Sequence, residues 1–349
     1  MRILVTGATG IVGAETLARL RAGEGVEAVG TSRGGRRALA ERAVGEVHPI
    51  VAWDLLEEPV PAQLRGPWDA IVHTAADTRW TLGPDEALRA NVDTVSALAP
   101  LVGSATHVVH VSTAFATGLR GSVDSPARED YRNTYEWSKA GAERLASATF
   151  PALTIVRPPL VIGRSSDGAA ARFTGMYTVL RAMSAGMVPA LVAIPDAPFD
   201  VVPVDALAAL LEDVGRRREP AGVLTIAGGE RAVTVSEAIG LIAEELNEWR
   251  TSRGAGPFEV PRMIPPESWE RFFLPLARKA LSPRQLKVLE LLGHFRPYLT
   301  LEEPLRPTNQ VEDARHAIAT SVRYWADANP RLALTPIPTP RPSERRRHK

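Results

Sequence analysis

A glycine-rich loop close to the N-terminus constrains this chain more than any other feature. A β-branched run, residues 2–6, leads into Thr6-Gly7-Ala8-Thr9-Gly10-Ile11-Val12-Gly13, and a helical stretch, residues 12–22, follows. In such a strand–loop–helix unit the first glycine permits the tight turn, the second lets a pyrophosphate approach backbone N–H groups, and the third lets the helix pack on the strand. We therefore expect a dinucleotide site formed by Gly7, Thr9, Gly10, Ile11, Val12 and Gly13; the alternative is a glycine-rich turn without a ligand.

Short apolar runs alternate with helical patterns over the first 160 residues. Candidate strands are residues 2–6, 27–31, 50–53, 70–73, 107–112 and 153–156, and helical patterns include 12–22 and 87–101. This alternation predicts an α/β fold, a Rossmann-like doubly wound parallel sheet with a smaller, mostly helical C-terminal part. We expect residues 1–165 to form the NADP-binding domain, with 200–235 rejoining the sheet, and 166–199 and 236–333 to form the substrate-binding part. Residues 334–349 are rich in proline and basic residues, which predicts a flexible tail.

The composition narrows the function classes. The 349 residues carry a net charge of +1 and no cysteine, so neither a general nucleic-acid binder nor a disulfide or thiolate metal site is expected. The seven histidines have no metal-ligand spacing, and we expect no metal. No apolar run reaches about 18 residues and no signal peptide is recognised, which predicts a cytoplasmic protein without a membrane span.

The end of the second predicted strand bears on which dinucleotide is bound. A carboxylate there would hold a ribose 2′-hydroxyl, but the chain instead reads Ser32-Arg33-Gly34-Gly35-Arg36-Arg37. A serine hydroxyl and guanidinium groups suit a 2′-phosphate, so Ser32, Arg33 and Arg36 predict NADPH; a solvated basic turn is the alternative. Asp54 and Leu55 follow the third strand, where they are placed to contact the adenine.

A tyrosine and a lysine four residues apart, Tyr135 and Lys139, share one face of a predicted helix. An ammonium group near a phenol lowers the pKa of the phenol, and the tyrosine can then give a proton to a carbonyl oxygen. The preceding strand ends in Ser112-Thr113, which brings hydroxyl groups to the sheet edge where ligands bind in such folds. The alternative for the pair alone is a surface helix contact.

These motifs, in this order, resemble the extended short-chain dehydrogenase/reductase superfamily over residues 1 to about 230. The shared stretches are the glycine loop, Asp54-Leu55, His73-Thr74-Ala75-Ala76, Asn91-Val92, Ser112-Thr113, Tyr135/Lys139 and Arg157-Pro158-Pro159. The resemblance implies that Thr113 binds the substrate carbonyl, that Tyr135 donates the proton, and that Lys139 holds the nicotinamide ribose. It also implies cofactor contacts at Ala75, Ala76, Asn91, Tyr135, Lys139, Pro158 and Leu160.

Four stretches are similar to fatty acyl-CoA reductases and related thioester reductases: 111–115 (VSTAF), 133–143 (NTY…K…AE), 154–161 (TIVRPPLV) and 200–205 (DVVPVD). A weaker similarity covers 295–299 (FRPYL), and the usual glycine is missing from 91–94 (NVDT). The resemblance implies an NADPH-dependent reduction of an acyl thioester, on a coenzyme or a carrier protein, to an aldehyde or alcohol. Separately, an exposed apolar helix pair could support a homodimer.

Two further kinds of function stay open at this stage. An extended short-chain dehydrogenase could act on a nucleotide sugar, as an epimerase or dehydratase, or on a small ketone, and a regulator could bind NADP without catalysis. Four residues with helical spacing, Trp269, Phe272, Phe273 and Leu276, favour core packing, with an apolar wall for an acyl chain as the alternative.

Overall fold

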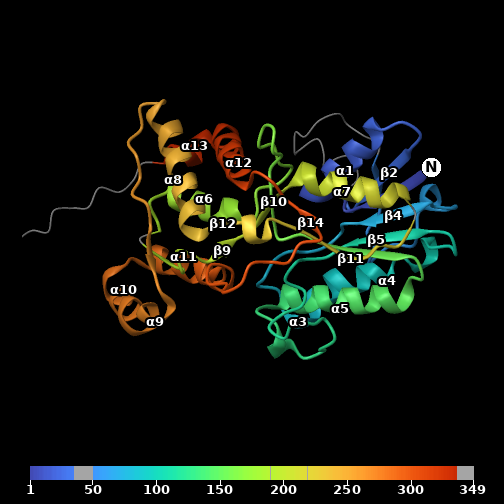
Figure 1. Ribbon diagram of the computed structural model, residues 1–349, viewed down its shortest axis with the longest axis horizontal. Helices are drawn as coiled ribbons and strands as arrows, with labels where there is room; N and C mark the ends of the chain where they lie inside the picture. The colour runs from blue at the N-terminus through green and yellow to red at the C-terminus, as the bar shows by residue number, and fades with distance from the viewer. Residues whose placement is uncertain (35–49, 189, 218, 336–349) are drawn as a thin grey trace, which may run out of the picture.

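The central sheet has eight strands, and its neighbouring strands pair in parallel. The structure is a computed structural model that describes residues 1–34, 50–188, 190–217 and 219–335 (Figure 1). The strand order is β14-β11-β6-β5-β4-β1-β2-β3. The strands are β1 (Arg2–Thr6), β2 (Glu27–Ser32), β3 (Ile50–Ala52), β4 (Ala70–His73), β5 (His107–Val111), β6 (Leu153–Arg157), β11 (Gly222–Ala227) and β14 (Asn309–Gln310). The predicted doubly wound α/β fold is confirmed.

Helices cover both faces of this sheet. One face carries α1 (Ile11–Ala22) and α7 (Val204–Arg217), and the other carries α3 (Pro84–Leu88), α4 (Thr94–Ser96) and α5 (Thr134–Thr149) (Figure 1). Successive side chains of a strand point to opposite faces. Accordingly, Val5 of β1 packs in the core beneath α1 and α7, whereas its neighbour Leu4 packs in the core beneath α4 and α5. Both residues are fully buried, which explains the continuous apolar runs of the sequence.

The strand order reverses between β1 and β4, and this reversal positions the site. Chain connections leave β1 and β4 toward opposite sides, which opens a crevice at the carboxyl ends of the strands where ligands bind. The glycine loop follows β1 at this point, and Thr74 and Ala75 follow β4 next to it. The loop predicted from the sequence therefore lies at the topological switch point.

A second, mostly helical part contains α6 (Met176–Ser184), α8 (Val235–Thr251) and α12 (Ala314–Ala328), which share one apolar core. It also contains α9 (Pro266–Ser268), α10 (Leu274–Ala280), α11 (Pro283–Gly293) and α13 (Pro330–Ala333) (Figure 1). Three two-stranded pairs accompany them: β7 (Leu160–Ile162) with β10 (Val201–Pro203), β8 (Ala190–Val192) with β13 (Arg262–Ile264), and β9 (Pro198–Phe199) with β12 (Val233–Thr234). In the described ranges no helix has the length and apolar character needed to cross a membrane.

The chain differs from the sequence expectation in two places. The helical pattern over 87–101 is divided into α3, a π-helical turn (Arg89–Asp93), α4 and a 3₁₀ turn (Ala99–Leu101). The π turn contains Asn91, whose side chain is drawn inward by hydrogen bonds to Ser138 and to the backbone of Asp77. In addition to β11, which lies within the residues 200–235 expected to rejoin the sheet, the chain returns to the sheet once more as β14.

Candidate active site

The glycine loop forms a cradle that excludes side chains. Gly7 has φ 67°, and a Cβ placed on it would lie 2.7 Å from the backbone nitrogen of Ala75. A Cβ on Gly13 would lie 2.3 Å from the carbonyl oxygen of Gly7. Gly10 precedes α1 and, having no side chain, leaves the first N–H groups of that helix without a side-chain cap. Such a helix end attracts phosphate, so the loop fits the pyrophosphate of a dinucleotide.

The residues predicted to select the cofactor lie at the ends of β2 and β3. The Ser32 hydroxyl is buried and has no hydrogen-bond partner among the described residues, while Arg33 beside it is exposed. An orphaned buried hydroxyl at the edge of the cradle fits a ligand that completes its hydrogen bonds. Asp54 and Leu55 follow β3, and one Asp54 carboxylate oxygen accepts the backbone N–H of Leu56. Arg36 lies outside the described residues.

Asn91 holds the loop after β4 in position by hydrogen bonds. Its amide group donates to the Ser138 hydroxyl at 2.8 Å and to the backbone oxygen of Asp77 at 3.0 Å, and its own oxygen accepts the Asp77 N–H at 2.7 Å. These bonds fasten the loop that contains Ala75 and Ala76 to helix α5. The contact of Asn91 with a cofactor stays a prediction.

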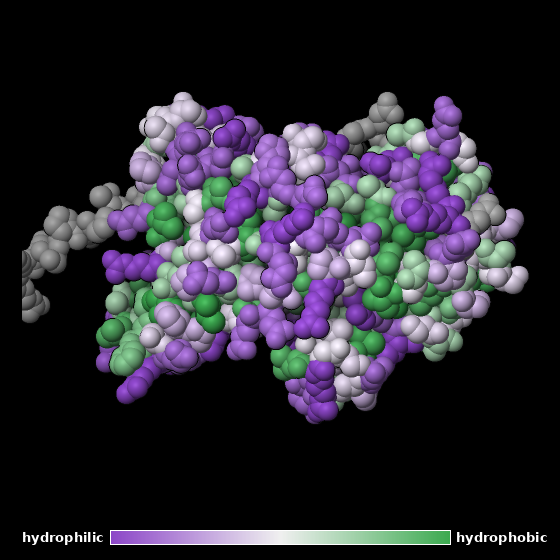
Figure 2. Space-filling view, in the orientation of Figure 1, coloured by the Kyte–Doolittle hydropathy of each residue, from purple (hydrophilic) through white to green (hydrophobic). Residues whose placement is uncertain are grey.

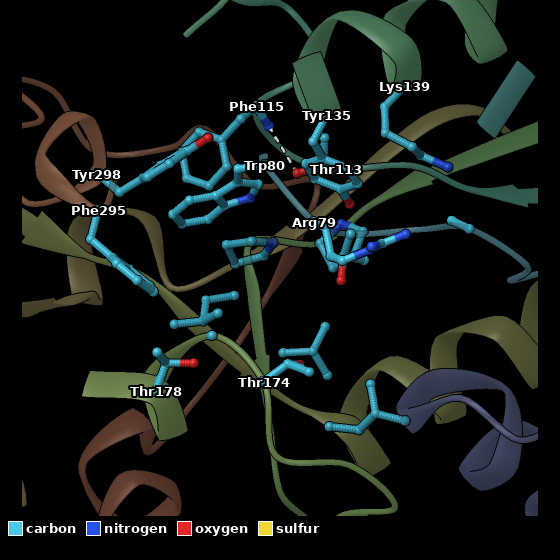
Figure 3. Close-up of a pocket in the computed structure, with 18 of the residues that line it drawn as sticks. Arg79, Trp80, Thr113, Phe115, Tyr135, Lys139, Thr174, Thr178, Phe295 and Tyr298 are labelled. Atoms are coloured by element: carbon cyan, nitrogen blue, oxygen red, sulfur yellow. Dashed lines mark hydrogen bonds between the residues drawn. The ribbon is translucent and has the colours of Figure 1, made fainter. Parts of the chain in front are cut away.

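The three predicted catalytic residues converge on one cavity. Thr113 follows β5, and Tyr135 lies in the first turn of α5, which begins where the Asn133 side chain accepts the Glu136 N–H at 3.0 Å. The Thr113 and Tyr135 side chains both line the cavity, together with Lys139 (Figure 3). The Ser112 hydroxyl is buried without a partner in the described part of the chain. Ser112 lines the same cavity, and the choice of Thr113 over Ser112 stays a prediction.

Lys139 is held in position by contacts with strand β5 of the sheet. Its side chain is 1% exposed, and its Nζ donates to the backbone oxygen of Val111 at 2.8 Å and lies 3.4 Å from Nε2 of His110. Burial lowers the pKa of Lys139 to about 8, although the nearby Glu143 carboxylate acts in the opposite direction.

Two stacked histidines lie beneath this lysine, and sequence reasoning did not assign either of them a role in the site. The rings of His73 and His110 are 5.4 Å apart, and the Thr6 hydroxyl lies 2.7 Å from Nδ1 of His73. Burial and then the charge on Lys139 lower the pKa of His73 to about 3 and the pKa of His110 well below its usual value. Both imidazoles are therefore neutral, and the positive charge of this layer is on Lys139.

The pKa of Tyr135 corrects one sequence expectation. Burial, and then the neighbouring Glu136 carboxylate, raise the pKa of Tyr135, against the expectation that Lys139 lowers it. The nearby Thr113 hydroxyl opposes this shift, and the Lys139 ammonium is engaged instead by Val111 and His110. The Tyr135 phenol consequently keeps its proton at neutral pH, as a proton donor must.

The cavity has a volume of about 440 Å³ and is mostly apolar. Ile11, Val12, Ala76, Pro158 and Leu160, all predicted cofactor contacts, line it. Aromatic residues form the wall beyond the Tyr135 hydroxyl: Trp80, Phe115, Phe295 and Tyr298 (Figure 3). Sequence reasoning did not assign these four to the site, although the similarity over 295–299 pointed at two of them.

The residues suggested as an apolar wall, Trp269, Phe272, Phe273 and Leu276, are absent from the cavity lining. Trp269 is buried and stacks on Phe273 in a small core of its own. Phe272 and Leu276 are 58% and 66% exposed, so the core-packing interpretation holds only for Trp269 and Phe273. Figure 2 shows apolar side chains at the surface of the lobe that α9 and α10 form. They face outward because α9 and α10 are short and present one side each to the body of the protein.

Solved structures share this architecture. The terminal R domain from the myxalamid PKS-NRPS biosynthetic pathway superposes with a TM-score of 0.72 and 20% identity, over 94% of this chain and 91% of that chain. A thiolation-reductase di-domain from an archaeal non-ribosomal peptide synthetase gives 0.66 and 17%, over 95% and 76%. The Bordetella bronchiseptica enzyme WbmG, in complex with NAD and UDP, gives 0.61 and 16%, over 98% and 99%. No curated protein matches the sequence significantly.

Together, the cradle at the switch point and the fold give the chain a Rossmann-like architecture that fits a dinucleotide and is similar to that of the extended short-chain dehydrogenases/reductases. Residues 56–211 match the family model described as male sterility protein. This match confirms the resemblance to the fatty acyl-CoA reductase and thioester reductase branch. It covers β4, β5 and α5, and thus Thr113, Tyr135 and Lys139.

Proposed function

We propose that this protein is an NADPH-dependent reductase of acyl thioesters, carried on coenzyme A or on a carrier protein, that yields an aldehyde or an alcohol. One observation carries the proposal: Thr113, Tyr135 and the buried Lys139 meet in a cavity whose lining is mostly apolar. A proton donor beside an apolar surface suits a carbonyl that bears a hydrocarbon group. The family match and the reductase domains among the solved structures support the same substrate class.

The cofactor proposal rests on the cradle and on the end of β2. Gly7, Gly10 and Gly13 fit the pyrophosphate, and Ser32 with Arg33 fits a 2′-phosphate, because no carboxylate follows β2 in the described part of this loop. Bound NADPH would supply the hydride that reduces the carbonyl carbon.

Two side chains of the protein then orient and protonate the carbonyl oxygen. Thr113 donates a hydrogen bond that orients the oxygen, and Tyr135 delivers its proton as negative charge develops there. The Lys139 ammonium, which donates to the Val111 oxygen, would hold the nicotinamide ribose. The product of the first reduction carries a hydroxyl group and the thioether sulfur of the carrier on one carbon. Cleavage of this carbon–sulfur bond releases the carrier as a free thiol and leaves the aldehyde. A second round at the same site would give the alcohol.

The aromatic wall also separates this proposal from the sugar-modifying alternative. WbmG, whose structure contains UDP, shares the fold, but a nucleoside diphosphate requires several polar and cationic groups. The wall beyond Tyr135 is formed by the rings of Trp80, Phe115 and Phe295, and Arg79, which also lines the cavity, is paired with Asp77 at 2.7 Å. An acyl group fits this surface better.

Replacement of Tyr135 by phenylalanine tests the catalytic assignment. The Tyr135→Phe variant should lose at least about 100-fold in kcat, because general acid catalysis contributes this much, while its NADPH affinity stays within about twofold. Tyr131→Phe is the matched control: the Tyr131 hydroxyl donates to the backbone oxygen of Ser125 at 2.8 Å and does not line the cavity. Unchanged turnover in Tyr135→Phe would refute the assignment and favour a regulator that only binds the dinucleotide.

A further inference from the structure

Four aromatic side chains form one continuous surface in the cavity, which we call the aromatic wall: Trp80, Phe115, Phe295 and Tyr298 (Figure 3). The Trp80 ring lies 4.7 Å from the Phe295 ring and 4.9 Å from the Tyr298 ring, and Tyr298 meets Phe115 edge-on at 4.9 Å. Tyr298 thus contacts two of the other three rings. Aromatic rings packed in this way hold one another in position.

The aromatic wall begins directly beside Thr113, the residue proposed to bind the carbonyl oxygen. Phe115 is two residues from Thr113, and its backbone N–H donates to the Thr113 hydroxyl at 3.4 Å. A carbonyl oxygen bound between Thr113 and Tyr135 therefore places the first carbons of its acyl group next to the wall. The space between the wall and Tyr135 limits how bulky these carbons can be.

A polar tether fixes Tyr298 to the catalytic helix. Its hydroxyl donates to a Glu136 carboxylate oxygen at 2.5 Å and accepts from the Asn133 side-chain amide at 2.6 Å. Glu136 is fully buried and is also paired with Arg132 at 3.3 Å, and Asn133 caps the helix that carries Tyr135. The Tyr298 ring and the Tyr135 phenol are consequently held in position by the same turn of helix α5.

Loss of one hydrogen bond from this tether should cost free energy, because it leaves a buried carboxylate with fewer donors. A buried carboxylate depends on its hydrogen-bond donors, and Glu136 has the Tyr298 hydroxyl and the Arg132 side chain and backbone as its partners. Removing the Tyr298 hydroxyl leaves the neighbour of the proton donor short of one donor. A ring held only by packing would not require such a connection.

We propose that Tyr298 determines the acyl specificity of the enzyme. Its ring limits the bulk of the acyl group beside the reacting carbonyl, and its hydroxyl group holds this ring in position relative to Tyr135. The inference rests on the proposed thioester reductase function and deepens it. It assigns as the preferred substrate an apolar acyl group that is unbranched next to the carbonyl. An acyl group with a methyl branch at that carbon would meet the aromatic wall.

Two thioesters of equal carbon number provide the test: hexanoyl-CoA, which is unbranched, and 2-methylpentanoyl-CoA, which is branched beside the carbonyl. The readout is the ratio of kcat/KM for the branched and unbranched thioesters, followed by NADPH absorbance. Tyr298→Ala should raise this ratio at least about tenfold, since one carbon in a shaped apolar site changes selectivity by about 10–200-fold. Tyr298→Leu should raise it in the same direction, and it replaces the alanine variant if that variant unfolds.

Tyr298→Phe separates the hydroxyl from the ring. It should keep the ratio within about twofold of wild type but lower kcat about tenfold for both thioesters, because the wall remains and the tether is lost. The control Tyr131→Phe, which loses a hydroxyl bond outside the cavity, should change neither quantity. The NADPH affinity of all variants should stay within about twofold.

The outcomes distinguish this inference from the function on which it rests. A wild-type protein that binds NADPH but reduces neither thioester, free or carrier-bound, contradicts the proposed function and the inference together. A wild-type protein that reduces thioesters, with a ratio that folded Tyr298→Ala and Tyr298→Leu leave unchanged, contradicts only the role of Tyr298. A kcat of Tyr298→Phe equal to wild type contradicts the tether.

Discussion

Two single substitutions in the glycine loop should separate folding from cofactor binding. A methyl group on Gly13 would lie 2.3 Å from the Gly7 oxygen and 2.6 Å from the Thr74 hydroxyl, so α1 has to move away from the loop. Overpacking of this kind costs about 1–3 kcal/mol in the free energy of unfolding. A methyl group on Gly10 meets the Gly7 oxygen only at 3.2 Å, and we expect a cost below about 1 kcal/mol.

The same methyl group on Gly10 would stand between the pyrophosphate and the N–H groups that open α1. One hydrogen bond to a charged group is worth about 1.5–3 kcal/mol, and each 1.4 kcal/mol is a factor of ten in affinity. Gly10→Ala should therefore raise the Kd of NADPH about 10–100-fold with little loss of stability, whereas Gly13→Ala should lower both the stability and the NADPH affinity.

Fluorescence titration with NADPH and urea unfolding measure the two quantities on the same samples. Gly240→Ala is the control: Gly240 lies in α8 with no atom within 4 Å of an added Cβ, so the helix should gain up to about 1 kcal/mol and the Kd should not change. A Gly10→Ala protein that binds NADPH as tightly as wild type would refute the assignment of this loop as the pyrophosphate cradle.

Three further predictions concern charge. Because the pKa of Lys139 is about 8 and its charged form is needed, kcat/KM should fall as the pH rises through about 8, and Lys139→Arg should move this limb upward; a flat profile to pH 9 would contradict the role. His73 is protonated below about pH 6.5 in the unfolded chain but only near pH 3 in the folded chain. The free energy of unfolding should therefore fall by about 3 kcal/mol between pH 7 and pH 4. Urea unfolding of His73→Asn should show a smaller fall in this free energy over the same pH range. Arg33→Asp should raise the NADPH Kd and lower the NADH Kd; an unchanged ratio of the two would show that Arg33 does not read the 2′-phosphate.

Sequence reasoning succeeded where one local pattern determines one local structure. The glycine loop had to follow a strand and open a helix, since each glycine is required by a close backbone contact within that unit. The alternation of apolar runs and helices likewise predicted a parallel sheet, because strands such as β4 and β5 are buried on both faces. Tyr135 and Lys139 share a helical face by spacing alone.

The remaining features depend on contacts between distant residues. Tyr298 reaches the catalytic helix across more than 160 residues of sequence, and nothing in its neighbourhood signals that Glu136 is its partner. The expected effect of Lys139 on the pKa of Tyr135 was wrong because the sequence could not show that Val111 and His110 bind the ammonium group. The helix expected over 87–101 is broken because Asn91 turns inward to bind Asp77 and Ser138.

The most direct test of the proposed function is the stoichiometry of one reaction. Wild-type protein, NADPH and a thioester, as acyl-CoA and as a carrier-bound acyl group, are mixed, and NADPH oxidation is followed together with the release of free thiol. The account predicts thiol release that requires NADPH, with one NADPH per thiol for an aldehyde product and two for an alcohol. NADPH oxidation with simple ketones or aldehydes but without thiol release from any thioester would contradict it.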